Sequence, residues 1–300
     1  MIYTYTTARS YYGKLTNNSS SGNLTDGDEI INSEIGRVLS VRPFPFLDRE
    51  TTTTTVANQQ YVEVPANFRK IKTVRVQQGT TNYHPKEVPS RQFWDNLNSV
   101  TASSYTSNAP EWFYLFNGRV YIWPTPSVAG TTTVYGRIGF NRLNIADNTT
   151  GTITTATTGS TTVVGSGTSW HALMAGRFIR ITEADSANSG DDEWYEIASV
   201  TNTTTIVLVK PYLGASIAAG SAALTIGQTI PLPDGYQEIP IYRAVQIYYS
   251  KIDQARYVHF KNMADGLEGG LIGDHGSATD SVVIEDGDDG IINPNLTVRL

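Results

Sequence analysis

The sequence predicts an α+β protein, in which a helical bundle with a long C-terminal helix accompanies an antiparallel β-sheet and an inserted all-β sandwich or barrel module. Apolar residues recur at three- and four-residue steps in the segment Pro233–Leu267, which is typical of a helix. Runs of threonine and 17 tyrosines favour strands elsewhere. Short alternating runs separated by Gly, Asn, Ser and Asp fill residues 148–228, as expected for a small antiparallel module.

The long C-terminal helix is expected to begin near Ile239, because Pro240 is tolerated in a first helical turn. Gly266, Gly269 and Gly270 are its predicted stop signals. A helix of ~30 residues would be ~45 Å long. Its expected core stripe comprises Ile241, Ala244, Val245, Tyr248, Ile252, Ala255, Met263 and Leu267.

Aromatic residues spread over more than one face of this helix: Tyr242, Tyr248, Tyr249, Tyr257 and Phe260. One interpretation is that one face packs on the domain while another meets a neighbouring molecule. The alternative is an ordinary core helix that is buried on two sides.

Two shorter helices are predicted near the N-terminus. The first covers Tyr5–Leu15, and the polar link Asn17–Gly22 follows it. Thr25 or Asp26 caps the second, which ends near Ser40, before two prolines. Packing against the long C-terminal helix is the expected role of both.

From Thr51 onward the pattern changes to strands. Thr51–Val56 and Tyr61–Val64 flank Ala57-Asn58, which reads as a hairpin connection. Asn117-Gly118 is the clearest hairpin turn in the chain and joins Trp112–Phe116 to Arg119–Trp123. Further strands are expected at Phe68–Gln77 and Thr131–Phe140, and a short helix capped by Ser90 is expected at Pro89–Leu97.

The domain organisation follows from these patterns. Residues 1–147 and 229–268 form the expected core of helices and sheet, and residues 148–228 form an inserted β-domain. Residues 269–300 form an extended tail rich in Gly, Asp and Ser, with strand-like pieces at Ser281–Ile284 and Leu296–Leu300. The five strands expected in the insertion are Thr161–Val164, Phe178–Ile181, Trp194–Ile197, Thr204–Val209 and Ala222–Ile226.

The sequence offers no catalytic, cofactor or metal site. The Gly165–Ser169 run lacks the lysine and the flanking helix of a phosphate loop. Asp286 begins a stretch that resembles a calcium loop, but Thr297 stands where the twelfth-position acid belongs. The four histidines are far apart in the sequence, and cysteine is absent. The net charge of −6 argues against coating nucleic acid, and no run reaches the ~20 apolar residues of a membrane span.

The stretches VANQQYVEVPANFRKIKTVRVQQG, PSRQFWDNL, APEWFYLFNGRVYIWPTPSVAG and TTTVYGRIGF, together with the terminal helices, resemble the head-to-tail adaptor (connector or head-completion) proteins of tailed bacteriophages. The resemblance covers residues 1–145 and 229–268. It implies a structural virion protein of the neck, made in the host cytoplasm, that forms a homo-oligomeric and usually dodecameric ring. The implied partners are the portal protein and a tail or nozzle protein, and double-stranded DNA passes through the lumen without sequence-specific binding. No enzyme activity, cofactor or membrane contact is implied.

Interface residues are expected on the long helix and in the tail. The predicted portal or neighbour contacts are Tyr242, Tyr249, Tyr257, Phe260, Val282, Val283, Ile284, Leu296, Val298 and Leu300. One alternative function is a receptor- or carbohydrate-binding tail component, based on Trp170, Trp194 and Tyr195 of the insertion. A glycosidase-like tail enzyme is a further, weaker alternative.

Overall fold

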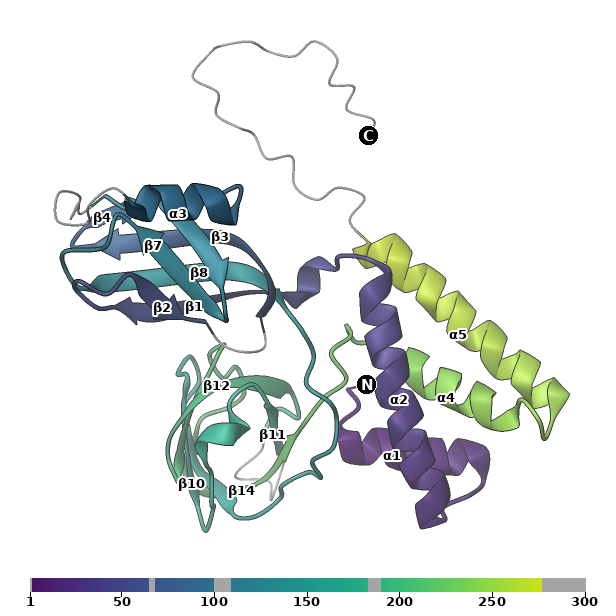
Figure 1. The fold of residues 1–300 in the computed structure, drawn as a ribbon. Coiled ribbons are helices and arrows are strands. Elements are labelled where there is room, and N and C mark those ends of the chain that lie inside the picture. The colour runs from purple at the N-terminus through teal and green to yellow at the C-terminus, as the bar shows by residue number, and fades with distance from the viewer. Residues whose placement is uncertain (1, 65–67, 100–108, 183–189, 277–300) are drawn as a thin grey trace.

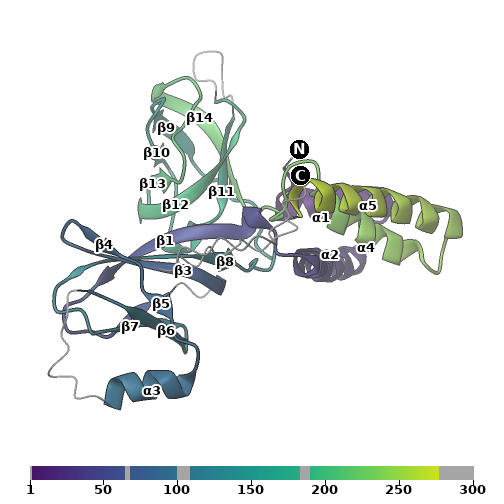
Figure 2. The same cartoon turned by 90° about the horizontal axis from the view of Figure 1, so that it is seen from above.

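The computed structural model describes residues 2–64, 68–99, 109–182 and 190–276. The chain folds into three lobes: a group of four helices, a two-sheet β-sandwich covered by one helix, and a closed β-barrel (Figure 1). Seen from above, the barrel, the two sheets and helix α3 follow one another as layers, with the helical lobe beside them (Figure 2). This arrangement confirms the predicted α+β class.

The helical lobe joins both ends of the described chain. Helices α1 (Tyr5–Thr16) and α2 (Ser21–Val41) pack on α4 (Ile239–Tyr249), which is followed by α5 (Gln254–His275). The shared core is apolar and includes Tyr12, Ile35, Phe44, Ile241 and Val245, all nearly inaccessible to solvent. The expected packing of the two N-terminal helices on the C-terminal helical region is therefore confirmed.

The first two helices begin at hydroxyl caps. The backbone N–H of Thr7 donates to the hydroxyl of Thr4 at 3.2 Å, and the backbone N–H of Thr4 donates to the hydroxyl of Thr7 at 2.7 Å. Helix α2 starts earlier than the sequence predicts, because Ser20 accepts a bond from the backbone N–H of Asn23 and so caps it. Thr25 and Asp26, the predicted caps, lie within the first turns of α2.

The expected single long helix is instead two helices, so this prediction is wrong. Residues 250–253 break the helix, and the Asp253 carboxylate caps α5 by accepting bonds from the N–H groups of Ala255 and Arg256. Ile252 and Ala255 consequently face solvent and are not part of the core stripe. The glycine stop signals are also wrong, because α5 continues through Gly266, Gly269 and Gly270 to His275.

The 3-10 turn η1 (Pro45–Leu47) connects α2 to the β-sandwich. One sheet has the order β1-β8-β3-β4, formed by Asp48–Thr55, Gly130–Ile138, Phe68–Gln78 and Thr81–Tyr83. The other has the order β2-β7-β6-β5, formed by Tyr61–Glu63, Arg119–Trp123, Trp112–Phe116 and Lys86–Glu87. Between the sheets lies a core of Val62, Val74, Val76, Phe113, Val120, Ile122 and Val134.

Of the two hairpin turns predicted in the sandwich, one is present and the other is not. The Asn117-Gly118 hairpin is confirmed: both residues have positive φ, and β6 pairs with β7 throughout. The hairpin expected across Ala57-Asn58 is wrong, because β1 pairs with β8 and β2 pairs with β7 in the opposite sheet. Partners distant in sequence therefore override the local turn signal.

Residues 148–228 contain a closed six-stranded barrel. Its strands are β9 (Thr152–Ala156), β10 (Thr162–Ser166), β11 (Phe178–Thr182), β12 (Trp194–Asn202), β13 (Thr205–Leu208) and β14 (Ile217–Gly227). The short turn η3 (Ala172–Met174) lies between β10 and β11. The five expected strands are present, and β9 is an additional strand that the sequence analysis missed. It closes the barrel by pairing with both β10 and β14.

The barrel is attached to the helical lobe through two adjacent chain segments. Asn148 and Ile226 exchange backbone hydrogen bonds of 2.8 Å in each direction, so the entry and exit of the barrel lie side by side. Thr4 forms a bridge with Thr229 and donates through its hydroxyl to Asp147. Further along, the buried amide of Asn32 exchanges two hydrogen bonds with the backbone of Leu143. The start of α1 and the middle of α2 thus hold these segments.

Candidate interaction surfaces

The aromatic residues expected to face a neighbour mostly lie inside the helical lobe. Tyr242, Tyr249 and Phe260 are only 5%, 4% and 8% exposed. The hydroxyl of Tyr249 donates to the backbone oxygen of Leu15 at 3.1 Å, which joins α4 to α1. Tyr257 is half-buried and packs on the same core. The expectation that Tyr249 is an exposed contact residue is therefore wrong, because the hairpin of α4 and α5 folds these rings inward.

The remaining predicted interface residues, Val282, Val283, Ile284, Leu296, Val298 and Leu300, lie outside the described residues. The acidic stretch beginning at Asp286 also lies there. The contacts expected of these residues stay predictions.

The turn between α4 and α5 exposes a small group of aliphatic side chains. Ile247, Ile252 and Val258 are 44%, 65% and 42% exposed, and they come from the end of α4, the turn and the start of α5. We call these three residues the hairpin tip. In Figure 1 this end of the hairpin points away from the sandwich and the barrel. An exposed aliphatic group at a projecting turn is suited to contact another protein.

A second surface lies on the outer face of the sheet β2-β7-β6-β5. In β6, Phe113 faces the sandwich core, so Trp112, Tyr114 and Phe116 face outward. In β7, Tyr121 faces outward and pairs with Tyr114 on one side. On the other side it pairs with Tyr61 of β2. Three neighbouring strands thus present a row of tyrosines on a face that a solvated sheet would fill with polar residues.

Helix α3 (Arg91–Ser99) partly covers this aromatic face. Ser90 caps the helix as predicted, since its hydroxyl accepts from the N–H of Phe93 at 3.2 Å. Trp94 is 5% exposed and stacks on Tyr114, with ring centroids 5.5 Å apart. Phe93 meets Trp112 edge-on at 5.1 Å. These contacts fix the helix on the sheet.

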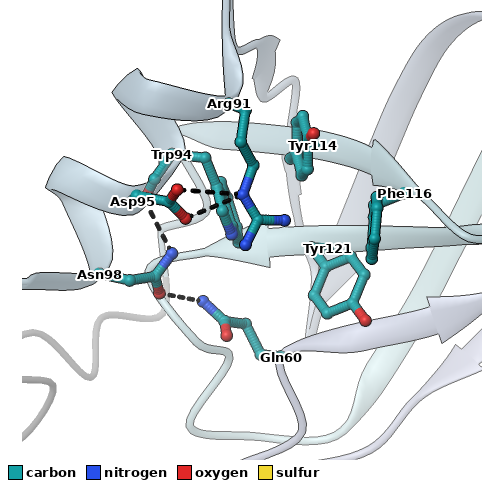
Figure 3. Close-up of a pocket in the computed structure, with 8 residues that line it drawn as sticks. All are labelled: Gln60, Arg91, Trp94, Asp95, Asn98, Tyr114, Phe116 and Tyr121. Atoms are coloured by element: carbon teal, nitrogen blue, oxygen red, sulfur yellow. Dashed lines mark hydrogen bonds and ion pairs between the residues drawn. The ribbon is translucent and has the colours of Figure 1, made fainter.

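Beside α3 the aromatic face opens into a pocket of about 370 Å³ (Figure 3). We call it the aromatic pocket; it is lined by Gln60, Arg91, Trp94, Asp95, Asn98, Tyr114, Phe116 and Tyr121. The amide of Gln60 donates to Asn98 at 2.7 Å, so the loop before β2 is tied to α3 across the pocket.

Arg91 forms an ion pair with Asp95 at this pocket. Its Nε lies 2.9 Å from a carboxylate oxygen of Asp95. Its guanidinium carbon lies 5.3 Å from the ring centre of Phe116 and 5.8 Å from that of Tyr114. Half of Phe116 remains exposed, at 51%. The pocket therefore combines aromatic surface with a fixed cation, a composition that recurs at the energetic centres of protein–protein interfaces.

This pocket is not among the features predicted from the sequence, although the sequence contains a signal for it. The strands WFYLF and RVYIW have large apolar or aromatic residues at outward as well as inward positions. Strands of this kind belong to a sheet that is covered on both faces. The helix capped by Ser90 is the cover on one side, and the part it leaves open is the pocket.

The aromatic residues that motivated a carbohydrate-binding function lie in the barrel. Trp170 and Tyr195 are 1% and 7% exposed and belong to the barrel core. Trp194 is half-buried, with the guanidinium of Arg180 5.8 Å from its ring centre. The buried rings of Trp170 and Tyr195 cannot stack on a sugar, which leaves only Trp194 in support of that interpretation.

Across the residues that the structure describes, no group of three or more His, Asp or Glu side chains is arranged to hold a metal ion. Among the same residues, no helix is long and apolar enough to cross a membrane.

The described residues thus present two candidate interaction surfaces, the hairpin tip and the aromatic pocket. Comparison with protein families gives a specific assignment. The sequence model of the SU10 adaptor protein family matches residues 3–155, which include α1, α2, the whole sandwich and the first barrel strand. The chain belongs to this family of phage head–tail adaptors. A comparison with curated proteins found no match.

Proposed function

We propose that the protein is a ring-forming structural component of the virion neck, which connects the portal of a tailed-phage head to the tail and lets DNA pass. The observation that carries this proposal is the match to the SU10 adaptor family over residues 3–155. The family supports a structural head–tail role. The proposal includes a homo-oligomeric ring, which the resemblance implies to be dodecameric. It also includes contacts to the portal protein and to a tail or nozzle protein.

The helical lobe is suited to contact neighbouring chains. The hairpin tip places Ile247, Ile252 and Val258 in solvent at one end of α4 and α5. Burying such side chains stabilises an interface by roughly 25 cal/mol per Å² of apolar area. We place a subunit or portal contact on the hairpin tip, in place of the buried aromatics Tyr242, Tyr249 and Phe260.

The charge of the chain is compatible with DNA passage. A net charge of −6 disfavours persistent adhesion of a polyanion, since non-specific DNA affinity comes from clustered Lys and Arg. In the proposed ring, DNA would move through the lumen without sequence-specific binding.

Electron microscopy of the purified protein, alone and with portal-bearing heads, tests this function. We expect closed rings, or rings that form at the portal vertex. A protein that stays monomeric and does not attach to portals would contradict the proposal.

A variant of the hairpin tip links the same experiment to a surface. Ile252→Asp should reduce ring formation or portal attachment, because it places a charge in the proposed apolar contact. The fold should be unaffected, because Ile252 is 65% exposed. Leu173→Asp is the matched control, since Leu173 of the barrel is 80% exposed and lies away from the hairpin tip. Equal loss in both variants would contradict the assignment of the contact to the hairpin tip.

A further inference from the structure

The aromatic pocket has the features of a docking site for a peptide segment. Phe116 is half exposed, and the Arg91 side chain, 56% exposed, lies over it. In Figure 3 the guanidinium of Arg91 extends from α3 across the aromatic rings, and Gln60 and Asn98 lie along the other side. A bound segment would therefore meet apolar surface, the Arg91–Asp95 ion pair and two amides within a single site.

We propose that the aromatic pocket receives the C-terminal segment, residues 277–300, of a neighbouring copy of the chain. Val282, Val283 and Ile284 would lie against the exposed aromatic surface, and the acidic run that follows them would lie near Arg91. The inference rests on the proposed function, because it names the surface through which adjacent subunits of the ring are connected.

The chemistry of the segment matches that of the pocket. Three successive aliphatic residues, Val282–Ile284, are followed directly by Glu285 and Asp286. In the pocket, the aromatic rings of Phe116 and Tyr114 likewise lie next to a charged group, the guanidinium of Arg91. Extended segments commonly bind by placing alternate side chains in pockets while polar groups fix their position.

The distribution of charge favours the same pairing. Residues 48–138, which form the sandwich, contain nine Lys and Arg against six Asp and Glu. Residues 277–300 contain five Asp and Glu against one Arg. The sandwich is thus net positive within a chain whose overall charge is −6, and the C-terminal segment is net negative. Opposite charges of this kind attract and orient two surfaces before contact.

The end of α5 is also suitably placed. The ring of His275 lies 5.8 Å from that of Phe46, which belongs to η1, the turn that leads into the sandwich. Helix α5 therefore ends beside the turn that leads into the sandwich (Figure 1), and the sequence continues for 24 residues beyond Gly276. Fully extended, they span up to about 80 Å, which is enough to reach an adjacent subunit.

Disulfide trapping in the full-length chain tests the inference, and the absence of native cysteine makes the result unambiguous. Gln60→Cys, at the pocket, is combined with Ser281→Cys, beside the aliphatic run, and the assembled protein is oxidised with glutathione disulfide. We expect covalently linked chains on a non-reducing gel. The control combines Ser281→Cys with Thr54→Cys, because Thr54 is exposed on the other sheet of the sandwich.

A charge-reversal variant tests the role of Arg91 in this contact. Arg91→Glu, added to the trapping pair, should slow cross-linking at least threefold at low ionic strength, because like charges then meet. Arg75→Glu is the matched control: Arg75 is 46% exposed and also pairs with a carboxylate, but lies on the other sheet. Equal slowing by both substitutions would contradict a specific role of Arg91.

Each outcome separates this inference from the proposed function. Cross-linking no faster than in the Thr54 control overturns the inference, and so does a link formed only within single chains. Electron microscopy of the same samples reports on ring formation independently. If rings form without specific cross-links, the proposed function is supported and the pocket assignment is contradicted. If specific cross-links form without rings, the pocket assignment is supported and the ring-forming function is contradicted.

Discussion

At the scale of single residues, Gly27 sets the distance between α1 and α2. A Cβ atom added there would lie 2.3 Å from Cε1 of Tyr12, a separation that non-bonded atoms do not adopt. Tyr12 is itself 1% exposed, so its ring cannot move into solvent. The close packing of α1 on α2 therefore requires a glycine at position 27, whereas the helical backbone conformation does not.

We predict that Gly27→Ala destabilises the protein by about 1–3 kcal/mol, the usual cost of overpacking a core. Gly22→Ala is the matched control in the same helix, because nothing lies within 4 Å of its added methyl group. That change should be neutral or stabilise by up to about 1 kcal/mol through helix propensity. Chemical denaturation of both variants measures the difference, and equal stabilities would contradict the close contact.

Glu268 is a second residue with a defined stabilising role. Both terminal nitrogens of Arg37 donate to its carboxylate at 2.9 and 2.8 Å, and Arg243 donates at 2.8 Å. The hydrogen bonds from Arg37, followed by those from Arg243, lower the pKa of Glu268. These bonds join α2, α4 and α5.

We predict that Glu268→Gln costs about 2 kcal/mol at neutral pH, the usual scale for hydrogen bonds between charged groups. Because the pKa of Glu268 is lower in the folded than in the unfolded chain, its contribution is present above the unfolded value and is lost as pH falls through the folded value. The stability difference between wild type and variant should therefore shrink in acid. Denaturation at pH 7 and near pH 3 checks this, and a constant difference would contradict it.

At the scale of elements, side-chain bonds and distant partners decide where helices and strands end and pair. The apolar spacing of residues 239–267 continues without interruption across the break at 250–253, yet Asp253 caps a new helix there. The turn signal at Ala57-Asn58 is equally local, but β1 finds eight partners along β8, more than 70 positions away. For the strands, a contact available only in the folded chain outweighs the local pattern. The helix break instead depends on the Asp253 cap, which acts within three residues and outweighs the apolar spacing.

At the scale of the whole molecule, the three lobes have separate hydrophobic cores. Among the described residues between 149 and 225, none belongs to the core of the helical lobe or to that of the sandwich. Residues 1–147 and 229–268, expected as one core region, contain two such clusters. The ion pair between Arg49 and Glu196, at 3.6 Å, connects the sandwich to the barrel; surface pairs of this kind contribute about 0–1 kcal/mol.

We predict that residues 149–225 can be replaced by a four-residue Gly/Ser linker without unfolding the rest. Asn148 and Ile226 already pair as neighbours in an antiparallel bridge, so a short hairpin connection fits between them. Gln228 is retained, because its side chain accepts bonds from the N–H groups of Asn144 and Ile145. Circular dichroism and thermal melting measure the outcome; loss of the helical signal would show that the barrel is required for folding.

The class of fold, the position of most strands, the Asn117-Gly118 turn and the Ser90 cap could all be predicted from the amino-acid pattern. These features depend on periodicity and on residues that act within a few positions, which are readable from the chain. The resemblance that it carried also led to the adaptor family.

The exposure of helix faces and the pairing of strands could not be predicted in the same way, because both depend on tertiary contacts. The spacing of Tyr242, Tyr249 and Phe260 is compatible with either a contact surface or a core, and the α4–α5 hairpin buries them. The aromatic pocket likewise forms only where α3 crosses the outer face of a sheet. Burial depends on what packs against a residue, and that partner comes from elements distant in the sequence.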